Sequence, residues 1–308
     1  MIPYTRKTLP NGLTVVVNRD RASKLAAVNI LYRVGARNEN PARTGFAHLF
    51  EHLMFRGTRA VENFDLPVQM ASGDNNAFTN NDYTDFYITL PKDNLETALW
   101  LESDRMEGLD ITPAKLEAEK KVVIEEFRQR YLNQPYGDQT MLLRALAYKV
   151  HPYRWAAIGL ATDHIAGATL ADVESFYRAH YRPSNAILSI SADMEEERML
   201  ELAEKWFAPL ADHPSETAAI PQEPVQTQAR RQEVERDVPA STVTVAYHMC
   251  ARTKPDFYTA DLVSDLLSGG DSGRLYTHLV KERNLLSSVN AYITGDVDPG
   301  PVSYTHLT

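Results

Sequence analysis

Residues 35–58 read GARNENPARTGFAHLFEHLMFRGT, and this segment contains the pentapeptide His48-Leu49-Phe50-Glu51-His52. In a helix the two histidines, four residues apart, share one face, and Glu51 lies about one turn after His48. Two imidazoles with a nearby glutamate are the ligand pattern of a catalytic zinc site, written in the reverse order of H-E-x-x-H. The sequence therefore predicts that His48 and His52 bind Zn²⁺.

A catalytic zinc ion usually has three protein ligands and one open position, so a third ligand is expected elsewhere. The candidate segment spans residues 117–128 and reads EAEKKVVIEEFR. Glu119 and Glu126 are separated by nearly two helical turns and therefore share a face. Either glutamate can bind the metal while the other holds a ligating histidine. The alternative is that Glu119, Glu125 and Glu126 belong to a solvated helix face.

Composition restricts the class of protein. A chain of 308 residues suits two domains, and 44% hydrophobic with 24% charged residues is typical of a globular protein. The net charge of −9 and the lack of a basic block argue against nucleic-acid binding. The single cysteine, Cys250, excludes an internal disulfide. No apolar run is long enough for a membrane span, and the N-terminal residues show no signal core, so a cytoplasmic location is expected.

Periodicity predicts alternating strands and helices. Strands are expected over residues 13–17, 25–34, 76–79, 83–90 and 186–191, and helices over residues 44–56, 94–106, 112–131, 170–181 and 195–207. Thr44 is the expected N-cap of the helix that carries the histidines, and Gly57 is its expected stop. In the strand before residue 91, Phe86, Ile88 and Leu90 alternate with polar residues, which indicates a half-buried strand.

The second half of the chain repeats the first. Residues 243–252 (VTVAYHMCAR) match residues 28–37 (VNILYRVGAR), and residues 260–266 match residues 47–53. Asp261, Ser264 and Asp265 replace His48, Glu51 and His52, so helix packing alone does not require the metal-type residues. Residues 209–230 lack periodicity and predict a linker. We expect domains at 1–208 and 231–308, and we expect the second domain to be an incomplete copy of the first. Residues 302–308 are expected to be foreign to the natural sequence, because this segment resembles a translated sequencing adapter.

These motifs together resemble the pitrilysin-type, inverted-zincin metallopeptidases, a family that includes mitochondrial processing peptidase and insulin-degrading enzyme. The segment at residues 119–128 resembles the family's E-K-x-V-V-x-E-E-x-R, which implies that Glu126, 74 positions after His52, is the third ligand. The same match implies that Glu119 contacts a ligand rather than the metal. Residues 76–84 (NAFTNNDYT), 151–159 (HPYRWAAIG) and 181–193 (YRPSNAILSISAD) also resemble family blocks.

The resemblance implies an α+β fold of duplicated two-layer domains, each a sheet with helices, and one Zn²⁺ per chain. The function predicted is that of a zinc endopeptidase acting on short or unfolded peptides, with Glu51 as general base for the metal-activated water. Asn76, Ala77, Phe78 and Thr79 would form a sheet edge to which an extended peptide adds as a strand; the alternative is an ordinary hairpin edge.

Many family members carry a substrate-facing Arg and, seven residues later, a Tyr in the second half. Here those positions hold Val280 and Ser287. The resemblance therefore implies a homodimer or a heterodimer with a related subunit, the latter bearing the Arg and Tyr. Two further hypotheses remain open: a catalytically weak, peptidase-like scaffold, and a metal-dependent hydrolase of small amides.

Overall fold

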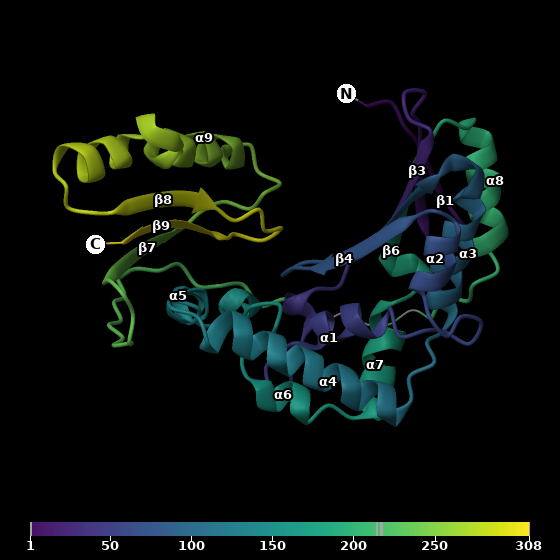
Figure 1. Ribbon diagram of the computed structural model, residues 1–308, viewed down its shortest axis with the longest axis horizontal. Helices are drawn as coiled ribbons and strands as arrows, with labels where there is room; N and C mark the ends of the chain where they lie inside the picture. Colours follow the sequence, from purple (N-terminus) through teal and green to yellow (C-terminus); the bar gives the residue numbers. More distant parts are fainter. Residues whose placement is uncertain (1, 214, 216–217, 308) are drawn as a thin grey trace. The chain divides into compact units, whose positions relative to one another are not determined.

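The computed structural model describes residues 2–213, 215 and 218–307, and its contacts divide the chain into two compact units (Figure 1). The first unit contains the residues up to Glu126 together with Ala157–Ala219. The second contains Phe127–Ala156 and the chain from Ile220 onward. The domain boundaries predicted from composition and repeat, 1–208, 209–230 and 231–308, are not tested by this division and stay a prediction.

A six-stranded mixed sheet forms the first unit's framework. Its strands are β1 (Thr5–Thr8), β2 (Thr14–Arg19), β3 (Leu25–Tyr32), β4 (Asp74–Thr79), β5 (Thr84–Pro91) and β6 (Ala186–Ala192), in the spatial order β1-β2-β6-β3-β5-β4. The β2–β6 pair is parallel, and the other neighbours are antiparallel. Strand β4 therefore lies at an edge of the sheet.

One face of this sheet packs into the hydrophobic core. In β3, Ala26, Val28, Ile30 and Tyr32 are fully buried, while the residues between them are more exposed. Helices α3 (Leu95–Glu107) and α8 (Glu196–Phe207) pack against each other and cover β2 and β3 (Figure 1). The alternation predicted for β5 holds for the buried Phe86, Ile88 and Leu90, between which Tyr87 and Thr89 are more exposed. It fails at Asp85, which is buried as well and accepts a hydrogen bond from Asn29 at 2.6 Å. Sheet and helices form the expected α+β layers.

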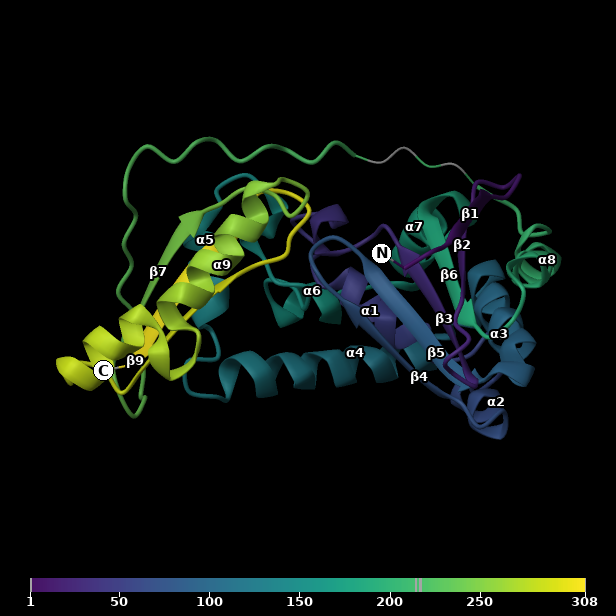
Figure 2. The same ribbon diagram turned by 90° about the horizontal axis from the view of Figure 1, so that it is seen from above.

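The first unit has further helices besides α3 and α8. They are α1 (Phe46–Leu53), α2 (Asp65–Met70), α4 (Pro113–Phe127), α6 (Thr162–Ala166) and α7 (Leu170–His180). Helix α1 packs on β4, β5 and α7, and α4 runs alongside α1 (Figure 2). After Phe127 the helix widens into a π-helical turn, Arg128–Leu132, so the helical segment ends close to the predicted position.

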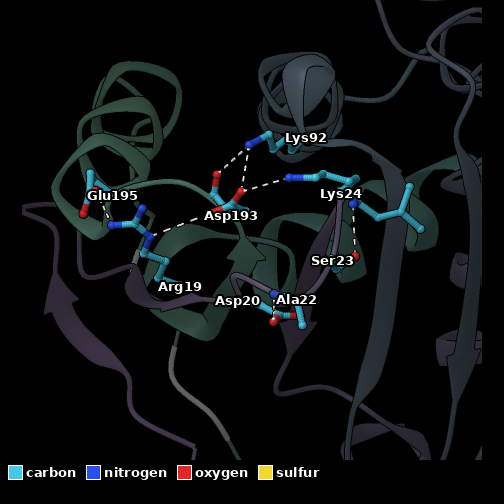
Figure 3. Close-up of polar contacts among 9 residues, drawn as sticks. Arg19, Asp20, Ala22, Ser23, Lys24, Lys92, Asp193 and Glu195 are labelled. Atoms are coloured by element: carbon cyan, nitrogen blue, oxygen red, sulfur yellow. Dashed lines mark hydrogen bonds and ion pairs between the residues drawn. The ribbon is translucent and has the colours of Figure 1, made fainter.

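A charged cluster joins the ends of four strands, β2, β3, β5 and β6, in the first unit (Figure 3). Asp193, directly after β6, accepts a hydrogen bond from Lys92 Nζ at 3.0 Å and lies 3.6 Å from Lys24 Nζ. Arg19, at the end of β2, is 3.9 Å from the same carboxylate. The hydrogen bond from Lys92 is the main cause that lowers the pKa of Asp193. These contacts fix the β2–β3 connection to the turn that leads into α8.

The second unit has a three-stranded antiparallel sheet in the order β7-β9-β8. Its elements are α5 (Gln139–Ala147), β7 (Thr242–His248), α9 (Asp256–Ser268), β8 (Ser288–Ile293) and β9 (Pro301–Leu307). Strand β7 and helix α9 fall on the predicted repeat of β3 and α1. Strand β9 includes residues that the sequence analysis sets apart as foreign, and their origin stays a prediction. None of the helices in the described part of the chain has the length and apolar character needed to span a lipid bilayer.

The repeated strands differ in how much of their surface is covered. Val28 and Ile30 of β3 are fully buried, whereas the matching Val243 and Val245 of β7 are 48% and 39% exposed. The sequence pattern is the same in both strands, so the difference lies in the helices that cover them. Helices α3 and α8 cover β3 and its neighbour β2, while α9 packs mainly on β8. The second sheet is therefore the less completely covered of the two. That the second domain is incomplete stays a prediction.

Candidate metal centre

Helix α1 presents its apolar side to the core and its polar side to α4. Leu49, Phe50 and Leu53 are fully buried, and the Phe50 ring stacks on Phe176 and Tyr181 with centroids 5.1 and 5.3 Å apart. This aromatic packing fixes the rotation of the helix about its axis. The opposite face, which carries the two histidines, is thereby held toward α4.

The beginning of α1 is held by a residue outside the helix. Gly45 precedes it with φ of 90°, a conformation that favours glycine, and a Cβ there would lie 2.6 Å from the Ile158 carbonyl oxygen. The buried Glu39 carboxylate accepts hydrogen bonds from the amides of Gly45 (2.9 Å) and Ala47 (2.8 Å). A carboxylate at this position satisfies helix amides and complements the helix dipole.

The prediction that Thr44 is the N-cap of this helix is wrong. The helix has Gly45 at that position, and no side chain there makes a capping hydrogen bond. Thr44 Oγ1 instead accepts a hydrogen bond from the Leu160 amide and lies 2.8 Å from His164 Nδ1. The predicted stop at Gly57 is also late, because the helix ends at Leu53. Glu39 was not predicted, because it lies seven positions before the helix and outside the first turn, where acidic residues are a recognised signal.

Glu126 of α4 meets both histidines of α1. Its Oε2 atom lies 3.7 Å from His48 Nε2 and 3.4 Å from His52 Nε2. One donor atom from each residue lies within 4.8 Å of the others, and this is the only group of three or more potential metal-binding side chains among the described residues. The structure thus brings together the three residues that the sequence analysis proposes as ligands.

The donor set fits a zinc ion. Zinc bonds of about 2.1 Å in tetrahedral geometry put neighbouring donor atoms about 3.4 Å apart. The two measured separations from Glu126 are close to that value, and two imidazoles with one carboxylate are a donor set of catalytic zinc sites. His48, His52 and Glu126 are therefore the residues that would hold the metal.

Glu119 is outside the group of three donor residues and contacts one of them, His52. It is 1% exposed, and its Oε2 atom lies 3.4 Å from His52 Nδ1, on the ring side opposite Nε2. Its Oε1 atom forms an ion pair with Arg56 at 2.5 Å. A carboxylate on the second ring nitrogen orients a ligating histidine and sets its tautomer. Glu119 is thus placed to hold His52, as the resemblance implies.

The two glutamates change the acidity of His52. Burial by itself lowers the pKa of His52, but hydrogen bonds and charge from Glu119 and Glu126 outweigh burial and raise the pKa to about 9. In the metal-free protein at neutral pH, His52 therefore carries a proton. The site attracts a cation, and a metal ion has to displace that proton.

Glu51 lines a cavity that one of the three donor residues, His52, also lines. The cavity has a volume of about 480 Å³. Its walls also include His52, Phe55 and Glu119, with Arg56 and Lys115 among the charged residues. Glu51 is partly exposed, so its carboxylate has access to solvent next to the candidate metal ligands. A cavity of this size has room for a water molecule and part of a peptide chain.

The predicted substrate residues lie on edge strand β4, against which α1 packs. Asn76 and Phe78 are exposed on one face, and Ala77 and Thr79 are half-buried on the other. Their backbone pairs with β5 on one side only, so the other side has the geometry needed for strand addition. In the second unit, Val280 lies on the π-helical turn Tyr276–Glu282, and Ser287 precedes β8.

Two family models match the chain. Residues 14–156 match the insulinase model of peptidase family M16, and residues 167–305 match the model described as the peptidase M16 inactive domain. All the candidate metal ligands lie in the first matched region.

Named relatives agree with this assignment. The zinc protease PqqE of Helicobacter pylori is 35% identical over 286 residues, which cover 91% of this chain and 64% of the relative. A probable mitochondrial-processing peptidase subunit beta of Arabidopsis thaliana is 25% identical over 313 residues, covering 97% of this chain and 58% of the relative. The chain thus spans less than two thirds of the length of either curated relative.

A solved structure, described as a protease from Helicobacter pylori, superimposes with a TM-score of 0.92 at 32% identity. The match covers 100% of this chain and 75% of that one. Both units therefore have counterparts in a related protein of known structure.

Proposed function

The chain belongs to peptidase family M16, the insulinase family of zinc proteases, and on that premise we propose that it is a zinc endopeptidase of short or unfolded peptides. The observation that carries the proposal is the convergence of His48, His52 and Glu126, of which His52 also lines a cavity together with Glu51. A hydrolase of small amides would need the same metal ligands but no strand edge. The edge strand β4 next to α1 therefore favours a peptide substrate.

Each residue has a distinct part in the proposed reaction. When bound, a zinc ion polarises water and the substrate carbonyl and lowers the pKa of that water toward neutrality. His48, His52 and Glu126 would hold the ion, and Glu119 would orient His52. Glu51 accepts the proton of the attacking water and delivers it to the nitrogen of the leaving amine. Strand β4 pairs with the peptide backbone, which orients the scissile bond with little dependence on side-chain sequence.

The test is to measure zinc content and peptide cleavage in the same preparations of wild type, Glu51→Gln and Glu125→Gln. Glu125 is an exposed neighbour of Glu126, so its substitution removes the same charge away from the donor atoms. We expect one zinc per chain in all three proteins and cleavage in wild type and Glu125→Gln only. Absence of zinc from the wild type would contradict the proposal.

A second candidate is a catalytically weak subunit that needs a related partner chain. Val280 and Ser287 stand where many family members have Arg and Tyr, and the model matching the second half is described as an inactive domain. A homodimer or a heterodimer is the partnership proposed in this case. Stoichiometric zinc without cleavage by the isolated chain, with cleavage restored by an Arg- and Tyr-bearing relative, would favour this candidate.

A further inference from the structure

The turn that joins β4 to β5 is bound to the segment that leads into α1. The amide of Ala36 donates a hydrogen bond to the Asn80 carbonyl oxygen at 3.1 Å, and the amide of Arg37 donates to the Asn81 carbonyl oxygen at 2.9 Å. A Cβ at Gly35 would lie 2.6 Å from the Asn80 oxygen. The two backbones therefore approach as closely as a glycine permits.

A buried ion pair closes the same contact. The Arg37 guanidinium lies 3.0 Å from Asp82 Oδ1, and the Asp82 side chain is 3% exposed. Burying a carboxylate away from water costs free energy unless the carboxylate is paired with a positive charge. The Asp82 amide also donates to Asn80 Oδ1 at 2.8 Å, as does the amide of Tyr83 at 2.9 Å. Asp82 is therefore the charged centre of a turn whose own hydrogen bonds are satisfied.

The other end of this segment holds α1. Glu39 follows the turn contact by two residues, and its carboxylate accepts the amide hydrogen bonds of Gly45 and Ala47 at the start of the helix. The backbone between the two contacts is itself closed, because the Glu39 amide donates to the Ala36 carbonyl oxygen. Residues 35–39 thus form a short brace, bonded to the end of the β4 hairpin on one side and to the metal-binding helix on the other.

We propose that the Arg37–Asp82 pair is a positioning device that fixes edge strand β4 relative to α1, and so sets the register of a peptide bound along β4. This inference rests on the proposed function. Strand addition requires the edge amides and carbonyls to be ordered before the peptide arrives, because ordering them on binding costs affinity. A displacement of about 1 Å between the peptide and the reacting groups is enough to slow a reaction strongly. The contacts of Asp82 that carry this role are those with Arg37 and Asn80.

The decisive experiment measures peptide binding rather than cleavage. The parent protein is the zinc-loaded Glu51→Gln variant, in which a labelled peptide is not consumed. The probe is an unstructured peptide of about twelve residues, long enough to pair with all six residues of β4. Asp82→Asn keeps the shape of the side chain but removes its charge. We expect the dissociation constant to rise roughly tenfold by fluorescence anisotropy, with zinc content unchanged.

Two controls separate positioning from general destabilisation. Glu195→Ala removes an ion pair with Arg19, which involves neither β4 nor the brace at residues 35–39. This control is expected to leave the dissociation constant unchanged. In the wild-type background, Asp82→Asn is expected to raise KM for the long peptide more than it lowers kcat. The same variant should leave kcat/KM unchanged for a blocked dipeptide amide, which is too short to pair along β4. If Asp82→Asn fails to fold, Arg37→Lys, which keeps the charge but loses the guanidinium fork, replaces it.

Equal weakening of long and short substrates would overturn the inference, as would loss of zinc or an unchanged dissociation constant for the long peptide. If the zinc-loaded parent binds no peptide, the inference also fails. A wild type that binds zinc and peptide but does not cleave would instead refute the proposed peptidase activity and leave the binding test of Asp82 decisive.

Discussion

Replacing Glu119 by glutamine is expected to weaken zinc binding although Glu119 is not among the candidate ligands. The Glu119 carboxylate lies 3.4 Å from His52 Nδ1 and is almost fully buried, so it is the group that orients the ring. Loss of such a partner typically costs about 10- to 100-fold in metal affinity, or about 1.4–2.7 kcal/mol. Arg56, which also loses its partner, is half exposed and adds little to the cost.

The size of this effect depends on pH. The pKa of His52 is about 9 in the metal-free protein, so at pH 7 zinc must displace a proton, which costs about two powers of ten in apparent affinity. Removing Glu119 lowers that pKa and so relieves part of the proton competition. Near pH 9 about half of the His52 rings have already lost that proton, so little competition remains. The ratio of wild-type to Glu119→Gln affinity is therefore expected to grow between pH 7 and pH 9.

The assay is competition for zinc against a chromophoric chelator at both pH values, with Glu126→Gln and Glu125→Gln measured beside Glu119→Gln. The expected order of loss is largest for Glu126→Gln, intermediate for Glu119→Gln and negligible for Glu125→Gln, because only Glu126 places an oxygen among the candidate donor atoms. The reasoning is refuted if Glu119→Gln behaves like Glu125→Gln at both pH values, or if Glu119→Gln loses more affinity than Glu126→Gln.

The remaining predictions concern stability. Burial first, and then the charge of Arg182, lower the pKa of His180 to about 4. As pH falls from about 6.5 toward 4, the histidine takes up a proton in the unfolded chain but not in the folded one. The free energy of unfolding therefore decreases by about 3 kcal/mol over this range. Chemical denaturation of metal-free protein should show a flatter pH dependence in His180→Gln, and an unchanged profile would contradict the assignment. The pKa of Asp193 is lowered by Lys92, so Asp193→Asn should destabilise the protein at pH 7, and this effect should diminish as pH falls below about 4. The matched control is Asp93→Asn, because Asp93 is exposed. Equal effects of the two substitutions would contradict a stabilising role of the charged cluster. Phe50→Ala should lower the free energy of unfolding by about 3–5 kcal/mol, because the ring is fully buried and stacked. Phe78→Ala should lower it much less, because Phe78 is 43% exposed. Similar values for the two variants in urea denaturation would refute the packing argument.

Local patterns were sufficient for the elements that carry the candidate site. The spacing of His48, Glu51 and His52 places them on a helix, and the structure has that helix at Phe46–Leu53. The alternation of residues 83–90 predicts strand β5, which the structure also has. The choice among Glu119, Glu125 and Glu126 needed the family resemblance, because Glu119 and Glu126 share a helix face and spacing alone does not rank them. The distances from the histidines separate the roles of these two glutamates.

Some contacts near the candidate site and in the core had no signal in the local sequence pattern. Thr44 has the chemistry of an N-cap, but Glu39 takes the first amides of α1 because the folded chain brings its carboxylate there. The buried pair of Glu102 and Arg105 was not predicted either. Their side chains are almost fully buried, and the guanidinium lies over the rings of Phe64 and Phe86 at 4.3 and 4.1 Å. Charged residues at helical spacing usually face solvent, so only the packing of those rings around Arg105 reveals the pair.

By itself the sequence determined the type of the segments that carry the candidate site: the helix with the imidazoles, the helix with the carboxylates and the hairpin strands beside them. These properties depend on neighbours within a few residues, and the side-chain periodicity records them directly. The sequence did not predict β1, α2, α5 or α6. Only the tertiary structure decided which faces meet. The 3.4 Å contact between His52 and Glu126, the pairing of Arg37 with Asp82 and the place of β4 at the sheet edge all join residues far apart in the chain. Such contacts form only when the apolar faces of the sheet and helices pack together, because that burial supplies the free energy that brings distant polar groups to one place.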